Sequence, residues 1–95
     1  MDIDGWRAKI DVIDEVLVEL LNRRAECALE IGEIKKAKGI GVYAPDRERW
    51  VLSEVRSLNR GPLSDEAMMR LFERIIDESR RLEREASEEA LGSPT

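Results

Sequence analysis

Apolar residues in the first third of the chain recur at alternating steps of three and four positions. With one polar exception, Arg24, this seam consists of Ile3, Trp6, Ile10, Ile13, Leu17, Leu20, Cys27, Ile31 and Ile34. The spacing places apolar side chains on one helix face and predicts a single long helix over residues 3–38. Asp2 or Asp4 can cap its N-terminus, and two glycines just beyond residue 38 stop it.

Two further helices are predicted after this one. Pro45 fits the first turn of a short helix that ends at the stop signal of residues 59–62. Ser64 can cap a helix of medium length, whose periodicity is lost from about Ala86. Because no segment alternates like a strand, we expect an all-α fold with one helical domain over residues 1–87. We expect residues 88–95 to form a disordered tail.

The predicted first helix is too long for a compact chain of this size. Unbroken from residue 3 to 38 it would extend ~54 Å, whereas a compact domain of 100 residues has a radius of gyration of ~13 Å. One end of the apolar seam would therefore remain in water. An intertwined homodimer is the simplest arrangement that covers it.

Polar residues interrupt the apolar stripe of each predicted helix. They are Arg24 and Lys35 on the first helix, Glu48 on the second, and Ser79 and Glu83 on the third. Each one alone is typical of a stripe edge, where a long side chain reaches water. Five of them on three helices predict a shared polar site if the three faces meet. Because buried cations need anionic partners, we expect this site to bind an anion.

Helical geometry limits which cations can share one ligand. Arg24 and Lys35 lie ~20° apart around the helix and ~16 Å apart along it, so their side chains can converge. Arg7 lies ~25 Å from Arg24 along the helix and ~100° around it. If Arg7 belongs to the same site, a second subunit must supply it. Arg23 points ~100° away from Arg24, and we expect it in solvent.

Composition narrows the classes of function. The 95 residues carry a net charge of −5 without a basic tract, so we expect no nucleic-acid partner. No apolar run approaches the ~20 residues that span a bilayer, and we expect no membrane contact. With no histidine and with Cys27 as the single cysteine, we expect no metal site. Cys27 is predicted to pack in the seam. A chain with one cysteine and no signal peptide suits the reducing cytoplasm.

Several stretches resemble the all-helical chorismate mutases. They are WRAKIDVID at 6–14, LLNRR at 20–24, IGEIK at 31–35, VYAPDRE at 42–48 and LFERIIDESRRLE at 71–83. The resemblance covers about residues 4–87. It implies an intertwined dimer with two equivalent sites that rearrange chorismate to prephenate, in the synthesis of phenylalanine and tyrosine. The reaction is an intramolecular 3,3-sigmatropic rearrangement, which needs no nucleophile, metal or cofactor.

The resemblance also implies how the dianionic substrate is held. Arg24 and the partner's Arg7 would bind the two carboxylates. Arg47 would support carboxylate binding, and Ser79 would add a hydrogen bond to a carboxylate. These contacts would keep the substrate in its compact, chair-like conformer, which is catalysis by positioning.

Three further residues would face the reacting part of the substrate. Lys35 would bind a carboxylate and the ether oxygen, and Glu83 would face the same oxygen. Because negative charge grows on that oxygen as its bond breaks, preorganised donors stabilise the transition state. Glu83 can donate only when it is protonated. Glu48 would hold the ring hydroxyl.

The chain departs from the family pattern at Ala44. Ala44 stands where many relatives have Asp, so the second helix lacks an N-cap worth ~1 kcal/mol and a contact to the ring hydroxyl.

Two alternative functions fit the same residues. An isochorismate pyruvate lyase would use much of the same cationic pocket. A non-catalytic regulatory or dimerisation module would fit the loss at Ala44. Retention of four cations together with Ser79 and Glu83 favours an enzyme.

Overall fold

The computed structural model describes residues 1–92 and contains three helices, α1 (Ile3–Ala37), α2 (Pro45–Leu58) and α3 (Asp65–Gly92). No strand occurs within residues 1–92, so the predicted all-α fold of a long, a short and a medium helix is confirmed. α3 runs beyond the end expected near Ala86. Residues 88–92 of the predicted tail are thus helical, and residues 93–95 lie outside the described residues.

Both ends of α1 are fixed by local hydrogen bonds. The Asp2 carboxylate accepts from the Gly5 amide at 2.9 Å, so Asp2 is the N-cap. At the other end, the Gly39 amide donates to the Lys36 carbonyl at 3.2 Å and the Ile40 amide to the Lys35 carbonyl at 2.8 Å. This pair of bonds is a Schellman motif. It requires the left-handed φ of 69° that Gly39 adopts.

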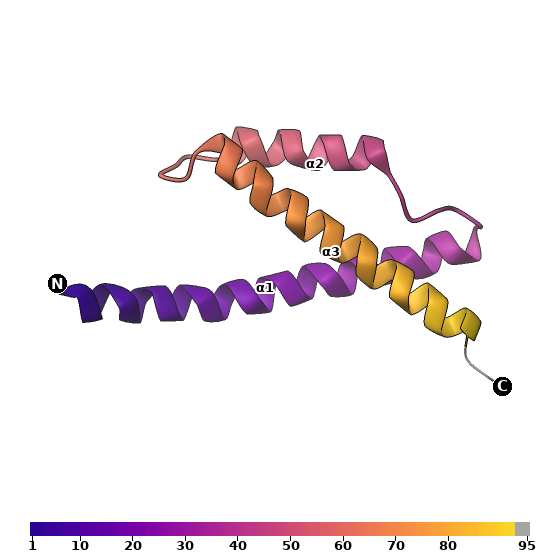
Figure 1. Ribbon diagram of the computed structural model, residues 1–95, viewed down its shortest axis with the longest axis horizontal. Coiled ribbons are helices and arrows are strands. Elements are labelled where there is room, and N and C mark those ends of the chain that lie inside the picture. The colour runs from indigo at the N-terminus through magenta and orange to yellow at the C-terminus, as the bar shows by residue number, and fades with distance from the viewer. Residues whose placement is uncertain (93–95) are drawn as a thin grey trace.

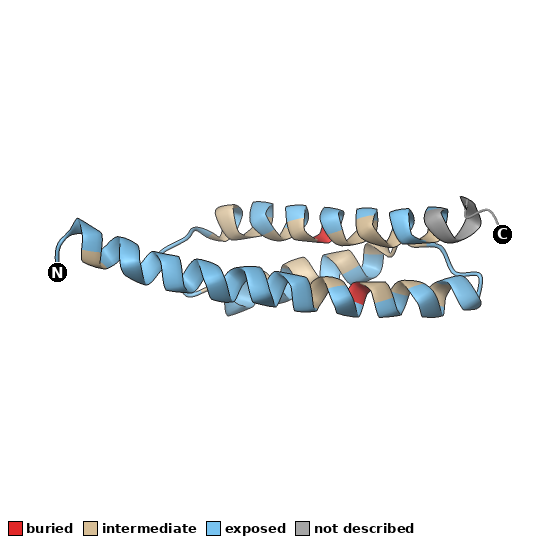
Figure 2. Ribbon diagram, turned by 90° about the horizontal axis from the view of Figure 1, so that it is seen from below, coloured by how far each residue is buried: buried red, intermediate tan, exposed pale blue. Residues whose placement is uncertain are grey.

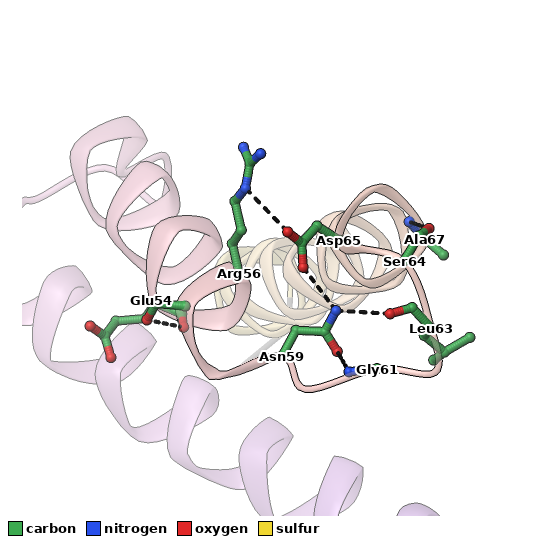
Figure 3. A network of polar contacts seen from close by, with 9 residues as sticks. Glu54, Arg56, Asn59, Gly61, Leu63, Ser64, Asp65 and Ala67 are labelled. Atoms are coloured by element: carbon green, nitrogen blue, oxygen red, sulfur yellow. Dashed lines mark hydrogen bonds and ion pairs between the residues drawn. The ribbon is translucent and has the colours of Figure 1, made fainter.

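A polar network fixes the turn between α2 and α3 (Figure 3). The side-chain amide of Asn59 donates to the Leu63 carbonyl and to the Asp65 carboxylate, both at 2.9 Å. Arg56 lies 3.6 Å from the other oxygen of the same carboxylate. α3 then begins with the Ser64 hydroxyl accepting from the Ala67 amide at 3.1 Å, so the predicted cap is confirmed.

α3 is the central element of the fold (Figure 1). It packs against α1 and against α2, while α1 and α2 make no packing contact with each other within residues 1–92. The N-terminal half of α1 projects away from the other helices (Figure 1). The chain is accordingly elongated, at 58 × 30 × 15 Å with a radius of gyration of 17.0 Å.

The single chain buries very little apolar surface. Within the described part of the chain, only Ala28 and Ile76 are buried hydrophobic residues, and most of α1 is exposed (Figure 2). The seam of α1 is in water: Trp6 is 56% exposed, Ile10 53% and Leu17 49%. This is the uncovered seam that the length of the helix predicts. No helix within residues 1–92 is long and apolar enough to cross a membrane.

Candidate functional site

A cavity of about 230 Å³, open to solvent, lies between the three helices and the linker before α2. Six of the seven predicted site residues line it: Arg24, Lys35, Arg47, Glu48, Ser79 and Glu83. Ala28, Ile31 and Ile76 contribute apolar wall. The polar residues that interrupt the three stripes therefore do meet, as the sequence predicts.

Arg24 joins α1 to α3 inside this cavity. Its guanidinium donates to the Ser79 hydroxyl at 2.8 Å, and both residues are half-buried. The neighbouring Arg23 points outward and pairs with Glu19 at 2.8 Å, with 68% of its side chain exposed. The predicted orientation of both arginines is therefore confirmed. Ser79 leaves most of the Arg24 donors available to an anion.

Lys35 connects the end of α1 to the linker before α2. Its ammonium donates to the Val42 carbonyl at 3.2 Å and is half-buried. An ammonium has three donors, so two remain for a ligand. Lys35 also stands close enough to Glu83 for its charge to affect that carboxyl.

Glu83 is held in an environment that favours its protonated form. Its Oε2 atom is buried and has no hydrogen-bond partner within the described structure. Burial raises the pKa of Glu83 above 4.5, and the charge of Lys35 opposes part of this rise. The side chain lies against Gly32, where an added Cβ would be 3.2 Å from the Glu83 Cγ. A protonated Glu83 can donate a hydrogen bond into the cavity.

Arg80 lines the same cavity and was not predicted as a site residue. Its Nε lies 3.1 Å from Glu48 Oε1, but neither atom has a hydrogen bond of good geometry, so the contact is an ion pair only. A hydrogen bond to Asp77 and the charge of Glu48 raise the pKa of Arg80, against the effect of burial. Arg80 follows Ile76 by four residues and precedes Glu83 by three, which places it on their helix face. That spacing is the sequence signal that could have found it.

The two remaining predicted cations differ in their position. Arg47 is exposed at the cavity wall, with its guanidinium 4.6 Å from the centre of the Trp50 ring. Arg7 lies on the projecting half of α1 and does not line the cavity. The predicted contribution of Arg7 from a second subunit is not tested by a single chain.

The charges of the cavity suit a small dianion. Arg24, Lys35, Arg47 and Arg80 provide four cations, and Glu48 and Glu83 provide two carboxyl groups. With both carboxyls ionised the balance is +2 (4 − 2), and it rises if Glu83 holds a proton. Donors fixed on different helices can meet developing negative charge without reorganising.

A second, larger cavity of about 430 Å³ lies between α1 and α3. It shares Arg24 and Ser79 with the first. The charged residues at its edge pair along α3: Arg74 with Glu78 at 3.0 Å and Arg81 with Glu85 at 3.2 Å. Because these charges are already paired, the smaller cavity is the better anion site.

Known proteins resemble this chain over nearly its whole length. The sequence model of the family described as chorismate mutase type II matches residues 6–84. A bifunctional chorismate mutase/prephenate dehydratase of Stutzerimonas stutzeri is 40% identical over 86 residues, which are 85% of this chain and 24% of that protein. A chorismate mutase of Methanocaldococcus jannaschii is 31% identical over 84 residues, with 87% of this chain and 85% of that protein covered.

A solved structure has the same fold. It is the chorismate mutase of Helicobacter pylori in complex with prephenate, which superimposes with a TM-score of 0.84 at 30% identity. The match covers 92% of this chain and 94% of that one. The bifunctional relative is much longer, since this chain spans about a quarter of its length.

Proposed function

The chain belongs to the chorismate mutase type II family, and from that membership we propose that it rearranges chorismate to prephenate in the cavity between its three helices. The observation that carries the proposal is the convergence of Arg24, Lys35 and Glu83 on one cavity. Chorismate is a dianion, and the cavity has an excess of cations. The reaction is an isomerisation, so every atom of the substrate is retained in the product.

Arg24 and Arg47 hold the substrate carboxylates in this proposal, and the Ser79 hydroxyl, which accepts a hydrogen bond from Arg24, orients the guanidinium. A planar guanidinium can bind both oxygens of a carboxylate, which fixes the conformer as well as the position. Because the reacting carbons are then held close together, part of the entropic barrier is removed before the chemical step.

Lys35 and protonated Glu83 stabilise the transition state. The ether C–O bond breaks as the new C–C bond forms, and negative charge grows on the ether oxygen. An ammonium and a neutral carboxyl can both donate to that oxygen. Glu48 binds the ring hydroxyl on the opposite wall of the cavity.

We also propose that the working unit is a homodimer in which the partner's Arg7 completes each site. The exposed seam of α1 supplies the apolar surface for such an interface. Arg7 projects from the same half of α1, too far along the helix to reach its own Arg24. A second chain packed along the seam would cover this apolar surface and would bring its own Arg7 to the site.

The direct test is an assay of chorismate consumption with prephenate detection. The Arg24→Ala variant should lose on the order of 100-fold or more in turnover, as for the loss of one preorganised donor. Arg23→Ala is the matched control, because it removes a neighbouring arginine that points into solvent. Equal losses in the two variants would contradict the proposed site. Isochorismate with pyruvate detection tests the lyase alternative, and turnover of neither substrate would favour a non-catalytic module.

A further inference from the structure

α2 is positioned by its packing on α3 and by the linker that precedes it. α2 carries Arg47 and Glu48 on one wall of the cavity, but it does not pack against α1, which carries the opposite wall. Within residues 1–92, α3 and the linker therefore set the distance between these two walls. A side chain of α3 that contacts both α2 and the linker would therefore control the geometry of the site.

Arg80 makes these contacts. Its Nε lies 3.1 Å from the Glu48 carboxylate of α2, and its guanidinium lies 5.3 Å from the centre of the Tyr43 ring in the linker. Within α3, the guanidinium also donates to Asp77. Three elements of the fold thus meet at one side chain.

The burial of the pair makes it stronger than an ordinary surface ion pair. Side chains of Arg80 and Glu48 are 28% and 21% exposed, whereas both partners of the Arg23–Glu19 pair exceed 60%. Partly desolvated charges interact more strongly than fully hydrated ones. The charge of Arg80 also offsets that of Glu48, which would otherwise repel a dianionic substrate.

We propose that Arg80 is a positioning residue of this site, which fixes the Glu48 carboxylate and the Tyr43 linker against α3. The inference rests on the proposed mutase function, since Glu48 is there the partner of the ring hydroxyl. Arg80 does not bind the substrate itself, because Glu48 and Asp77 engage two sides of its guanidinium and Tyr43 covers a face.

The test is a double-mutant cycle between Arg80 and Glu48. Arg80→Gln should lower kcat/KM by about 10-fold, mainly through KM, because a displaced Glu48 no longer aligns the substrate. In the Glu48→Gln background the same change should have an effect of less than about 2-fold. Arg80→Lys keeps the charge but not the planar fork, and should recover part of the loss.

Arg84→Gln is the matched control, since it removes an exposed arginine of the same helix that does not line the cavity. An Arg80→Gln variant that matches this control would overturn the proposal. So would an undiminished loss in the Glu48→Gln background, which would mean that Arg80 contacts the substrate directly.

A second readout separates this inference from the proposed function. Thermal unfolding of the same four proteins of the cycle measures the coupling of Arg80 to Glu48 without any substrate. A wild-type protein without mutase activity would refute the function. Additive shifts in Tm would refute the positioning role, whatever the activity.

Discussion

At the scale of single residues, the site depends on how each polar side chain is held. Arg24 is oriented by Ser79 and Lys35 by the Val42 carbonyl. Glu83 has a buried oxygen without a partner within the described residues. Arg24 and Lys35 act as cations, whereas Glu83 can donate a hydrogen bond only when its carboxyl is protonated.

Activity should therefore fall as the pH rises. Burial raises the pKa of Glu83 above 4.5, so the folded protein retains this proton to a higher pH than the unfolded chain. The stabilisation that goes with the raised pKa is complete below the unfolded value and is lost as the pH rises through the folded value. Turnover should follow the same protonated form. Glu83→Gln supplies a permanent donor and should flatten the alkaline limb between about pH 5 and 9. If turnover depends on pH in the same way in the wild type and in Glu83→Gln, Glu83 is not the titrating donor.

The second prediction at this scale concerns the substitution Gly32→Ala. An added Cβ would lie 3.2 Å from the Glu83 Cγ, so Gly32→Ala should displace the Glu83 side chain. Turnover should fall by about 10-fold, since a small misplacement of a donor is costly. Helix stability should nevertheless rise by up to ~1 kcal/mol, because alanine is the better helix former. Combining Gly32→Ala with Glu83→Ala gives the control. A further loss of turnover in that double variant would mean that Gly32 acts by another route.

At the scale of helices, the capped ends were predictable, whereas the contacts of Arg80 with other elements were not. Asp2, Gly39 and Ser64 act on backbone groups within a few residues, so their roles can be read locally. The role of Arg80 was missed, because Glu48 and Tyr43 belong to other elements and only the tertiary fold brings them together.

The far end of α3 shows a second limit of pattern reading. Helix was expected to end near Ala86, where the apolar spacing stops, yet α3 continues to Gly92. Glutamate and alanine have high helix propensity, so a segment rich in them can be helical without an apolar stripe. Apolar periodicity indicates which helix face packs against the protein, so it does not locate the end of a helical segment that lacks an apolar stripe.

The start of α2 carries the prediction that belongs to this scale. Ala44 provides no side-chain cap, and Pro45 begins the helix directly after it. Ala44→Ser should raise the free energy of unfolding by about 1 kcal/mol, because its hydroxyl can accept from an amide of the first turn. Thermal or urea unfolding measures the change. Ala44→Asp should stabilise in the same way but adds a negative charge to the cavity wall, so a comparison of KM separates capping from charge. No gain in either variant would exclude a missing cap as a weakness of α2.

At the scale of the whole molecule, a single chain leaves most of the apolar seam of α1 exposed. Among residues 1–88, it buries only Ala28 and Ile76 as hydrophobic core, and it extends over 58 Å. Five of the six predicted residues that line the cavity interrupt the apolar stripes, so helix phase could identify them, whereas Arg47 was indicated only by the family resemblance. The dimer and the position of Arg7 in it depend on a second chain, and they remain predictions.

Complementation between two inactive variants tests the shared site. In a mixed dimer of Arg7→Ala and Arg24→Ala chains, one site receives both substitutions and the other receives neither. Refolding an equal mixture should thus restore about a quarter of wild-type activity, because half of the dimers are mixed and each has one intact site. The Arg7→Ala,Arg24→Ala chain refolded alone is the control. No recovery in a sample with verified mixed dimers would show that each site belongs to one chain.

The exposed seam of α1 also affects how a single substitution would act in a symmetric dimer. In a two-fold symmetric assembly, one codon change appears on both sides of the axis, and near the axis an altered side chain faces its own copy. In the proposed dimer, a substitution at Ile10 or Ile13 would therefore be present in both chains. Where such a residue lies at the axis, a new charge would meet a like charge, whereas a well-fitting apolar residue would improve the interface on both sides at once. Random mutagenesis of α1 should accordingly produce larger losses and larger gains in dimer stability than random mutagenesis of α2.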